Sequence, residues 1–344
     1  MESPSPSKPR RHRISPTALF FACLLGASFY LGCSSSDSDS APQGSDPERT
    51  GGGASNAGDT DAETGGSNTG LGDDGASTET APSSSAGCGK ADVSVGARTL
   101  EVRGEAGDFI ISVPSDYSAE TAYPLGFAFH GYNRTHAECK ATDCAGFQSV
   151  MGEKAILVYM KSFTDGWEQE EIRDQNADFF EGVLDLVLDE LCVDENRVFI
   201  AGTSSGASFS NVLACRFGDR LLASAPVAGN LPEDEGCVGQ VAVVAIHGID
   251  DPHVTFESGE RARDFFLSQN GCSSTTIPEL PQVHAEIRAS RDIDETNQKC
   301  VDYQGCDAGY PVRWCEHSEG GYDDSTHGWP TAGGQLIWDF VSNL

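Results

Sequence analysis

The stretch Arg197-Val198-Phe199-Ile200-Ala201-Gly202-Thr203-Ser204-Ser205-Gly206 decides the fold of this chain. Its first five residues form a short apolar run that is typical of a strand, and the residues after Ser204 have a helical spacing that continues to Cys215. A strand-to-helix turn this sharp brings backbone atoms close together, so it needs glycine on both sides of the serine. The stretch therefore predicts a tight turn that presents Ser204 at the start of a helix.

Further apolar runs and helical patterns alternate along the chain on both sides of this turn. Most of the apolar runs are continuous, as expected of strands that are buried on both faces of a parallel sheet. We expect strands over 109–113, 125–129, 156–159, 197–201 and 241–246, and helices over 178–191, 205–215, 258–268 and 335–342. This alternation predicts an α/β protein with a mostly parallel, doubly wound sheet that is flanked by helices.

A candidate acid follows the expected strand 241–246. The sequence there is His247-Gly248-Ile249-Asp250-Asp251-Pro252, at the carboxyl end of the strand, where catalytic loops gather in sheets of this kind. A carboxylate at this place could orient an imidazole ring and stabilise its cation. We expect Asp251 to be this acid, and Asp250 is the alternative.

A candidate base lies near the end of the chain. His327 belongs to Ser325-Thr326-His327-Gly328-Trp329-Pro330, a loop just before the last expected helix. The chain order of serine, acid and histidine is the order found in the α/β-hydrolase fold. We therefore expect this fold, with Ser204 as nucleophile, Asp251 as acid and His327 as base, and with His317 as the alternative base.

Two backbone N–H groups, from different segments of the chain, are the expected donors to an oxyanion. One is the amide of Ser205, at the start of the expected helix. The strand 125–129 runs into His130-Gly131-Tyr132, and in this fold the loop after an early strand supplies the second donor. We assign that donor to the amide of Tyr132, with the amide of Gly131 as the alternative, and expect a structural role for His130.

Two tryptophans are candidates for binding the substrate. Trp167 follows the expected strand 156–159 and could form an apolar wall for an acyl or aryl group, although core packing is an equal alternative. Trp329 lies two residues after His327 and is the second candidate. Both assignments concern binding of the substrate and not the chemical steps.

The first 87 residues differ in composition from the rest of the chain. A basic stretch and an apolar run over 18–31 predict a signal peptide over 1–32. Tyr30-Leu31-Gly32-Cys33 resembles a bacterial lipobox, so we expect lipidation of Cys33; an ordinary cleaved signal is the alternative. Residues 33–87 are rich in Ser, Gly and Asp and are expected to be a disordered tether, which leaves 88–344 as the catalytic domain. The chain is then exported and lipid-anchored at the bacterial cell surface or outer membrane, or otherwise secreted.

Charge and cysteine content exclude some functions. The formal net charge of −31 argues against a nucleic-acid partner, because phosphate binding needs a basic patch. An even set of cysteines follows Cys33, and export makes disulfides their expected state. No Cys-x-x-Cys pair occurs, so we expect neither a zinc site nor any cofactor. The pairing cannot be deduced from the spacing; we expect only that Cys192 and Cys215 are tied to nearby loops.

Two more segments complete a family resemblance. They are Cys192-Val193-Asp194, which leads to Arg197-Val198, and Ala225-Pro226-Val227-Ala228-Gly229. With the motifs quoted above, they resemble the polyhydroxybutyrate depolymerase and feruloyl esterase family over nearly the whole stretch after Cys88. The resemblance implies a serine carboxylesterase that forms an acyl-enzyme, uses no cofactor and acts on esters of plant cell-wall polysaccharide, a polymeric substrate.

Several alternatives to this function remain open. Within the same chemistry they are polyhydroxyalkanoate depolymerisation, deacetylation of xylan and peptide hydrolysis, because all can use one triad. From a different class, the chain could be a catalytically inactive surface lipoprotein that binds carbohydrate on a hydrolase scaffold. Only the pocket could separate the esterases, and its shape cannot be deduced from the sequence.

Overall fold

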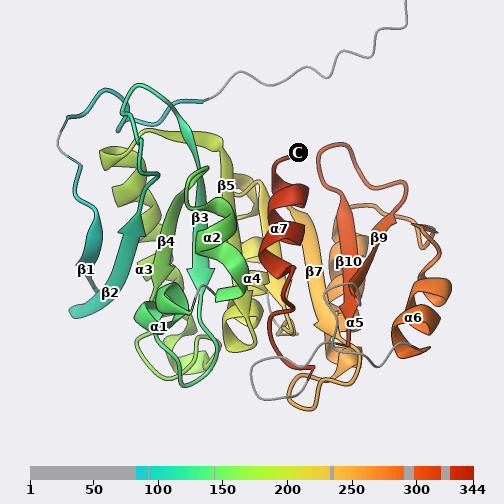
Figure 1. Cartoon of the computed structure of the whole chain (residues 1–344). Helices are drawn as coiled ribbons and strands as arrows, with labels where there is room; N and C mark the ends of the chain where they lie inside the picture. The colour runs from blue at the N-terminus through green and yellow to red at the C-terminus, as the bar shows by residue number, and fades with distance from the viewer. Residues whose placement is uncertain (1–82, 92, 143, 233–235, 290–297, 319–325) are drawn as a thin grey trace, which may run out of the picture. The chain divides into compact units, whose positions relative to one another are not determined.

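The computed structural model describes residues 83–91, 93–142, 144–232, 236–289, 298–318 and 326–344 (Figure 1). The expected signal peptide, Cys33 and nearly all of the expected tether lie outside these ranges. In the described part, no helix is both long enough and apolar enough to cross a membrane.

The described residues contain strands and α-helices in alternation. The strands are β1 (Gly96–Val102), β2 (Glu105–Ser112), β3 (Tyr123–Phe129), β4 (Ile156–Met160), β5 (Val193–Thr203), β6 (Ala223–Val227), β7 (Ala242–Gly248), β8 (Thr276–Ile277), β9 (Gln298–Tyr303) and β10 (Val312–His317). The α-helices are α1 (His136–Ala141), α2 (Phe147–Met151), α3 (Glu170–Glu190), α4 (Ser205–Arg216), α5 (Phe256–Gln269), α6 (Leu280–Ala289) and α7 (Gly333–Val341).

Within the described ranges, these strands form one 10-stranded sheet in the order β1-β2-β4-β3-β5-β6-β7-β10-β9-β8. Neighbouring strands from β4 across to β10 pair in parallel. The pairs at both edges are antiparallel. The prediction of an α/β protein with a mostly parallel sheet flanked by helices is thus confirmed.

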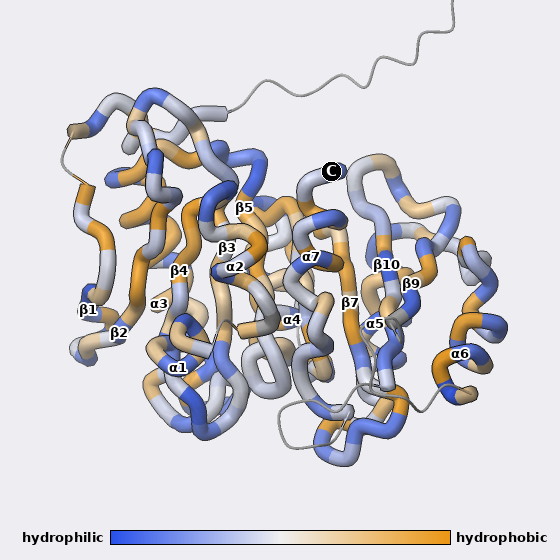
Figure 2. The backbone as a smooth tube through the Cα atoms, viewed as in Figure 1, coloured by the Kyte–Doolittle hydropathy of each residue, from blue (hydrophilic) through white to orange (hydrophobic). Residues whose placement is uncertain are grey.

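Both faces of the sheet are covered, which explains its continuous apolar strands. Phe127 and Phe129 of β3 belong to the core under α3, α4 and α5, whereas Ala128 between them belongs to the core under α2 and α7. Figure 1 shows α2 and α7 in front of the strands. All residues of β4 and β7 are buried, and the hydrophobic colour follows both strands in Figure 2. A parallel strand with helices on each side has no polar face.

The strands and helices expected from the sequence are all present, with shifted ends. The helix expected over 178–191 begins earlier, at Glu170. The prediction missed its first two turns because they are polar and lack apolar periodicity. Strand β6 was not predicted, since it is short and contains Pro226. The edge strand β1 was missed as well, and so were β10, β9 and β8, which continue the sheet beyond β7 to its other edge.

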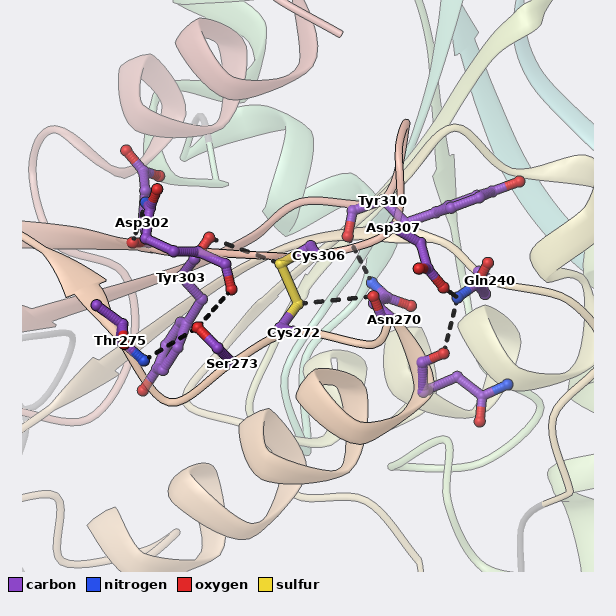
Figure 3. The surroundings of a disulfide bond; sticks show 12 residues. Gln240, Asn270, Cys272, Ser273, Thr275, Asp302, Tyr303, Cys306, Asp307 and Tyr310 are labelled. Carbon is purple, nitrogen blue, oxygen red and sulfur yellow. Dashed lines mark hydrogen bonds between the residues drawn. A yellow bond between two sulfur atoms is a disulfide. The ribbon is translucent and has the colours of Figure 1, made fainter. Parts of the chain in front are cut away.

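Disulfides join all ten cysteines of the described part, as expected of an exported protein. The pairs are Cys88–Cys192, Cys139–Cys144, Cys215–Cys237, Cys272–Cys306 and Cys300–Cys315. Figure 3 shows Cys272–Cys306, which ties the chain after α5 to the loop after β9. Beside it, Asn270 is fully buried, and its side-chain amide donates to the carbonyls of Val241 and Tyr310 at 2.8 and 3.0 Å.

The packed chain begins before the predicted domain boundary at Cys88. The Ser85 amide donates to the Val193 carbonyl at 2.9 Å, and the Ser85 hydroxyl donates to the Leu191 carbonyl at 2.6 Å. Ser85 itself is buried. The last residues of the expected tether, from Ser83 on, therefore lie against the chain that leads into β5.

Candidate functional site

Ser204 occupies a strained turn between β5 and α4. Its backbone has φ 54° and ψ −120°, a conformation that residues with a side chain rarely adopt. A Cβ on Gly202 would lie 2.3 Å from the Gly206 carbonyl oxygen, and a Cβ on Gly206 would lie 2.3 Å from the Phe129 carbonyl oxygen. Both glycines are therefore required by the close approach of backbone atoms, as the motif predicted.

The turn lies at the carboxyl edge of the sheet, and so does the loop after β7 that carries Asp251. The Ser204 amide donates to the Val227 carbonyl at the end of β6, and the Ala228 amide donates to the Ile246 carbonyl in β7, both at 2.9 Å. Asp251 follows β7 three residues after its end. Hence Ser204 and Asp251 extend from the same edge, with one strand between theirs.

The two candidate acids point to different surroundings. The Asp251 side chain is fully buried, whereas the Asp250 side chain is 61% exposed and lies near Arg288. His327 Nδ1 lies 2.9 and 2.8 Å from the two carboxylate oxygens of Asp251. The structure thus brings Asp251, and not Asp250, to His327.

The loop that carries His327 reaches Asp251 by packing against the end of β7. A Cβ on Gly248 would lie 1.9 Å from the Thr326 carbonyl oxygen, so only glycine fits there. The Thr326 hydroxyl also accepts from the Asp250 amide at 3.2 Å. The alternative base, His317, is fully buried at the end of β10.

The charge of Asp251 is stabilised in spite of its burial. Burial raises the pKa of this carboxyl group, but hydrogen bonds from His327 and from the amides of His253 and Val254 outweigh it and hold the pKa below its usual value. Asp251 is therefore ionised at neutral pH. A carboxylate that accepts from Nδ1 fixes the proton on that nitrogen, which leaves Nε2 as the acceptor of the ring.

The loop after β3 lies against Ser204. A Cβ on Gly131 would lie 3.7 Å from the Ser204 Cβ. His130 is buried; its Nδ1 lies 2.8 Å from the Gly131 carbonyl oxygen, and its Nε2 accepts from the Ser162 amide at 3.3 Å. The proton is therefore on Nδ1 and the ring is neutral, which agrees with the structural role expected for His130.

The two tryptophans expected to bind substrate differ in exposure. Trp167 has 0% exposed surface, stacks on Phe209 at 4.9 Å and donates from Nε1 to the His130 carbonyl at 2.9 Å. The assignment of Trp167 as a wall of the substrate site is wrong, because the core closes over its ring. Trp329 is half-buried, at the edge of the core under α7, and its role stays a prediction.

Sequence reasoning missed residues that support this site. Glu168 accepts a hydrogen bond from the Ser205 hydroxyl. Asn176 of α3 is fully buried, and its side-chain amide donates to the Ser162 hydroxyl at 3.1 Å. An acid two residues before a helix and an asparagine inside one carry no motif, so only their place in space identifies them.

The buried His130 makes stability depend on pH. Burial lowers its pKa to about 4 from 6.5. Because the neutral form is favoured in the fold, its contribution is complete above pH 6.5 and is lost as the pH falls from 6.5 towards 4. We expect His130 to account for about 3 kcal/mol of the loss in the free energy of unfolding between pH 7 and pH 4.

Chemical denaturation at pH 7 and pH 4 measures this effect in the chain and in His130→Asn. The variant should lose less stability between the two pH values. An equal loss in both proteins would contradict the assignment of a neutral, buried imidazole.

The described residues hold no cluster of three or more His, Cys, Asp or Glu side chains that could bind a metal ion. Their polar groups at the carboxyl edge of the sheet are instead a serine, an imidazole and a carboxylate. This set has the chemistry of a nucleophile with a base and its orienting acid.

Comparison with known proteins gives relatives of low identity. No family model matches the chain. It is 28% identical over 252 residues to feruloyl esterase D of Neurospora crassa, covering 69% of this chain and 81% of that protein. It is 28% identical over 212 residues to feruloyl esterase C of Emericella nidulans, covering 59% of this chain and 75% of that protein.

A solved structure agrees with the fold. The acetyl xylan esterase from Aspergillus awamori superposes with a TM-score of 0.53 at 11% identity, covering 72% of this chain and 99% of that one. At this identity the likeness concerns the fold alone. The chain has the α/β-hydrolase fold, as its motifs predicted.

Proposed function

We propose that this α/β-hydrolase is an exported serine carboxylesterase of the feruloyl esterase type, with Ser204, His327 and Asp251 as its triad. The observation that carries the proposal is the pairing of His327 Nδ1 with both oxygens of the buried Asp251, at the sheet edge from which Ser204 extends. A surface binding protein on an inactive scaffold would have no need of a buried, ionised acid against this histidine.

The reaction would begin at the Ser204 hydroxyl. His327 Nε2 accepts the proton while Ser204 Oγ attacks the ester carbonyl, and Asp251 stabilises the imidazolium. The resulting oxyanion accepts hydrogen bonds from the amides of Ser205 and Tyr132. When the intermediate collapses, the imidazolium gives its proton to the leaving alcohol and the acyl group remains on Ser204.

Water then completes the cycle. His327 takes a proton from the water that attacks the acyl-enzyme, and returns it to Ser204 as the acid leaves. Each proton in the two steps moves through His327, so the sequence of steps requires no cofactor.

The substrate assignment rests on the relatives. Those described above are feruloyl esterases, which favours an aromatic acyl ester over polyhydroxyalkanoate. Two aromatic residues of the proposed site are not fully buried: Tyr132 is 54% exposed, and Trp329, two residues after His327, is half-buried. Five disulfides in the described residues fit an oxidising compartment and hence export, and lipidation at Cys33 would hold the chain at the cell surface, near a polymeric substrate.

Hydrolysis of four esters tests the proposal. We expect the chain to release ferulate from methyl ferulate faster than it acts on acetylated xylan or polyhydroxybutyrate, with p-nitrophenyl acetate as a general ester. Ser204→Ala should lose at least about 10³-fold in rate, because the nucleophile is gone. Preference for another ester would correct the substrate, and the absence of any Ser204-dependent hydrolysis would refute the function.

A further inference from the structure

The two halves of the proposed oxyanion hole come from segments far apart in the sequence. One half is the loop 130–132 after β3, and the other is the start of α4 at Ser205. Their amides must keep a fixed separation, because an oxyanion donor loses its effect when it moves by a fraction of an ångström. A single segment, residues 162–168 after β4, contacts both halves.

The first half is held by the ends of this segment. The Ser162 amide donates to His130 Nε2, and the Trp167 indole donates to the His130 carbonyl at 2.9 Å. His130 in turn donates from Nδ1 to the Gly131 carbonyl, which also accepts from the Arg134 amide. Because a peptide group is planar and trans, its C=O and N–H point in opposite directions. Fixing the Gly131 carbonyl therefore also fixes the direction of the Tyr132 N–H.

The second half is held by Trp167 and Glu168. The Trp167 amide donates to the Ser205 hydroxyl oxygen at 2.9 Å, and the hydroxyl donates to the Glu168 carboxylate. Ser205 is buried, so water does not compete for its hydroxyl. Glu168 thus fixes the residue whose amide is the other proposed donor.

The segment is itself anchored in the core. The Asn176 side-chain amide donates to the Ser162 hydroxyl at 3.1 Å and to the Trp167 carbonyl at 3.3 Å, and the Ser162 hydroxyl donates to the Gly166 carbonyl. The Trp167 ring is stacked on Phe209 of α4 and meets Phe129 of β3 edge-on. The segment is therefore rigid relative to both halves.

We infer that residues 162–168 are a clamp that sets the width of the oxyanion hole, with Trp167 and Glu168 as its positioning residues. The inference rests on the proposed function. It assigns a role in turnover to Trp167, whose buried ring excludes it from binding substrate, and to Glu168, which lies outside the triad. Each residue acts through its contact with Ser205 or His130. Neither is assigned a contact with the reacting atoms.

Removal of the Glu168 carboxylate tests the clamp. In Glu168→Ala, kcat for p-nitrophenyl acetate should fall about tenfold with KM within about twofold and with the acid limb of the pH profile unmoved, because the triad is untouched. Ser205→Ala keeps the backbone donor and should show the same loss, and the double variant should lose no more than either single one. Glu168→Gln still accepts from the hydroxyl and should stay within about threefold of the unchanged chain.

A matched control lies far from the site. Glu168 accepts from the Ser205 hydroxyl and from the Trp167 amide. The Glu153 carboxylate likewise accepts from a serine hydroxyl and a backbone amide, those of Ser115 at 2.6 and 2.9 Å. Glu153→Ala should leave kcat unchanged. If Glu168→Ala behaves like Glu153→Ala, or if Glu168→Gln is as impaired as Glu168→Ala, the clamp is refuted.

A second variant tests the other half independently. Trp167→Phe keeps an aromatic ring against Phe209 but removes the indole N–H that holds the His130 carbonyl. We expect kcat to fall about fivefold with KM nearly unchanged, measured well below the melting temperature of the variant, because one positioning hydrogen bond is lost. Full activity in this variant would contradict the clamp, whereas inactivity of the unchanged chain toward every ester would instead refute the proposed function.

Discussion

Asp251→Asn is expected to lower kcat by about 10⁴-fold, although it preserves the shape of the side chain. The asparagine amide would donate to His327 Nδ1, and the ring would then carry its proton on Nε2, where it cannot accept the proton of Ser204. Asp251 is placed for this role by two contacts with His327 Nδ1, at 2.9 and 2.8 Å. Turnover of p-nitrophenyl acetate measures the loss.

The neighbouring aspartate provides the control for this result. The Asp250 side chain is 61% exposed and forms an ion pair with Arg288, at 3.7 Å. Asp250→Asn should therefore stay within about threefold of the unchanged chain, as expected of a surface ion pair. Equal losses in the two variants, or a larger loss at Asp250, would contradict the assignment of the acid.

Gly206→Ala should both destabilise the fold and impair turnover. The new Cβ would lie 2.3 Å from the Phe129 carbonyl oxygen and 2.6 Å from the His130 carbonyl oxygen, so backbone must move. We expect the free energy of unfolding to fall by about 3 kcal/mol. Turnover should fall at least about 100-fold, because the same displacement separates the start of α4 from the loop that contains Tyr132.

Gly236→Ala is the matched control for this substitution. Gly236 is exposed, and among the described residues a Cβ there would have no neighbour within 4 Å. Thermal unfolding and turnover of p-nitrophenyl acetate should be measured for both variants under the same conditions. A Gly206→Ala variant as stable and active as Gly236→Ala would show that the close approach at the turn is not needed.

The sequence predicted the centre of the sheet well, because buried parallel strands leave a strong pattern. The runs that became β3, β4, β5 and β7 are continuous and apolar, and the glycines at 202 and 206 reflect contacts that any side chain would block. The order of serine, acid and histidine then located the candidate triad. Chain order alone could not separate Asp250 from Asp251, since their difference is one of side-chain direction.

Features that depend on distant contacts were not predicted. Trp167 follows a strand, where a substrate wall and a core residue look alike in sequence, and only packing against Phe209 decides between them. Glu168 and Asn176 gain their roles from bonds to Ser205 and Ser162. Disulfide pairing also depends on distance in space: Cys88 and Cys192 are 104 residues apart in the chain.

The most direct test of the central claim is labelling of the folded chain with a fluorophosphonate probe, followed by fragmentation of the labelled peptide. The account predicts one probe per chain, attached to Ser204, with labelling slowed at least about 100-fold in His327→Ala. Absence of labelling in a folded chain that carries all five disulfides, or attachment to Ser205 or any other residue, would contradict the assignment of Ser204 as the activated nucleophile.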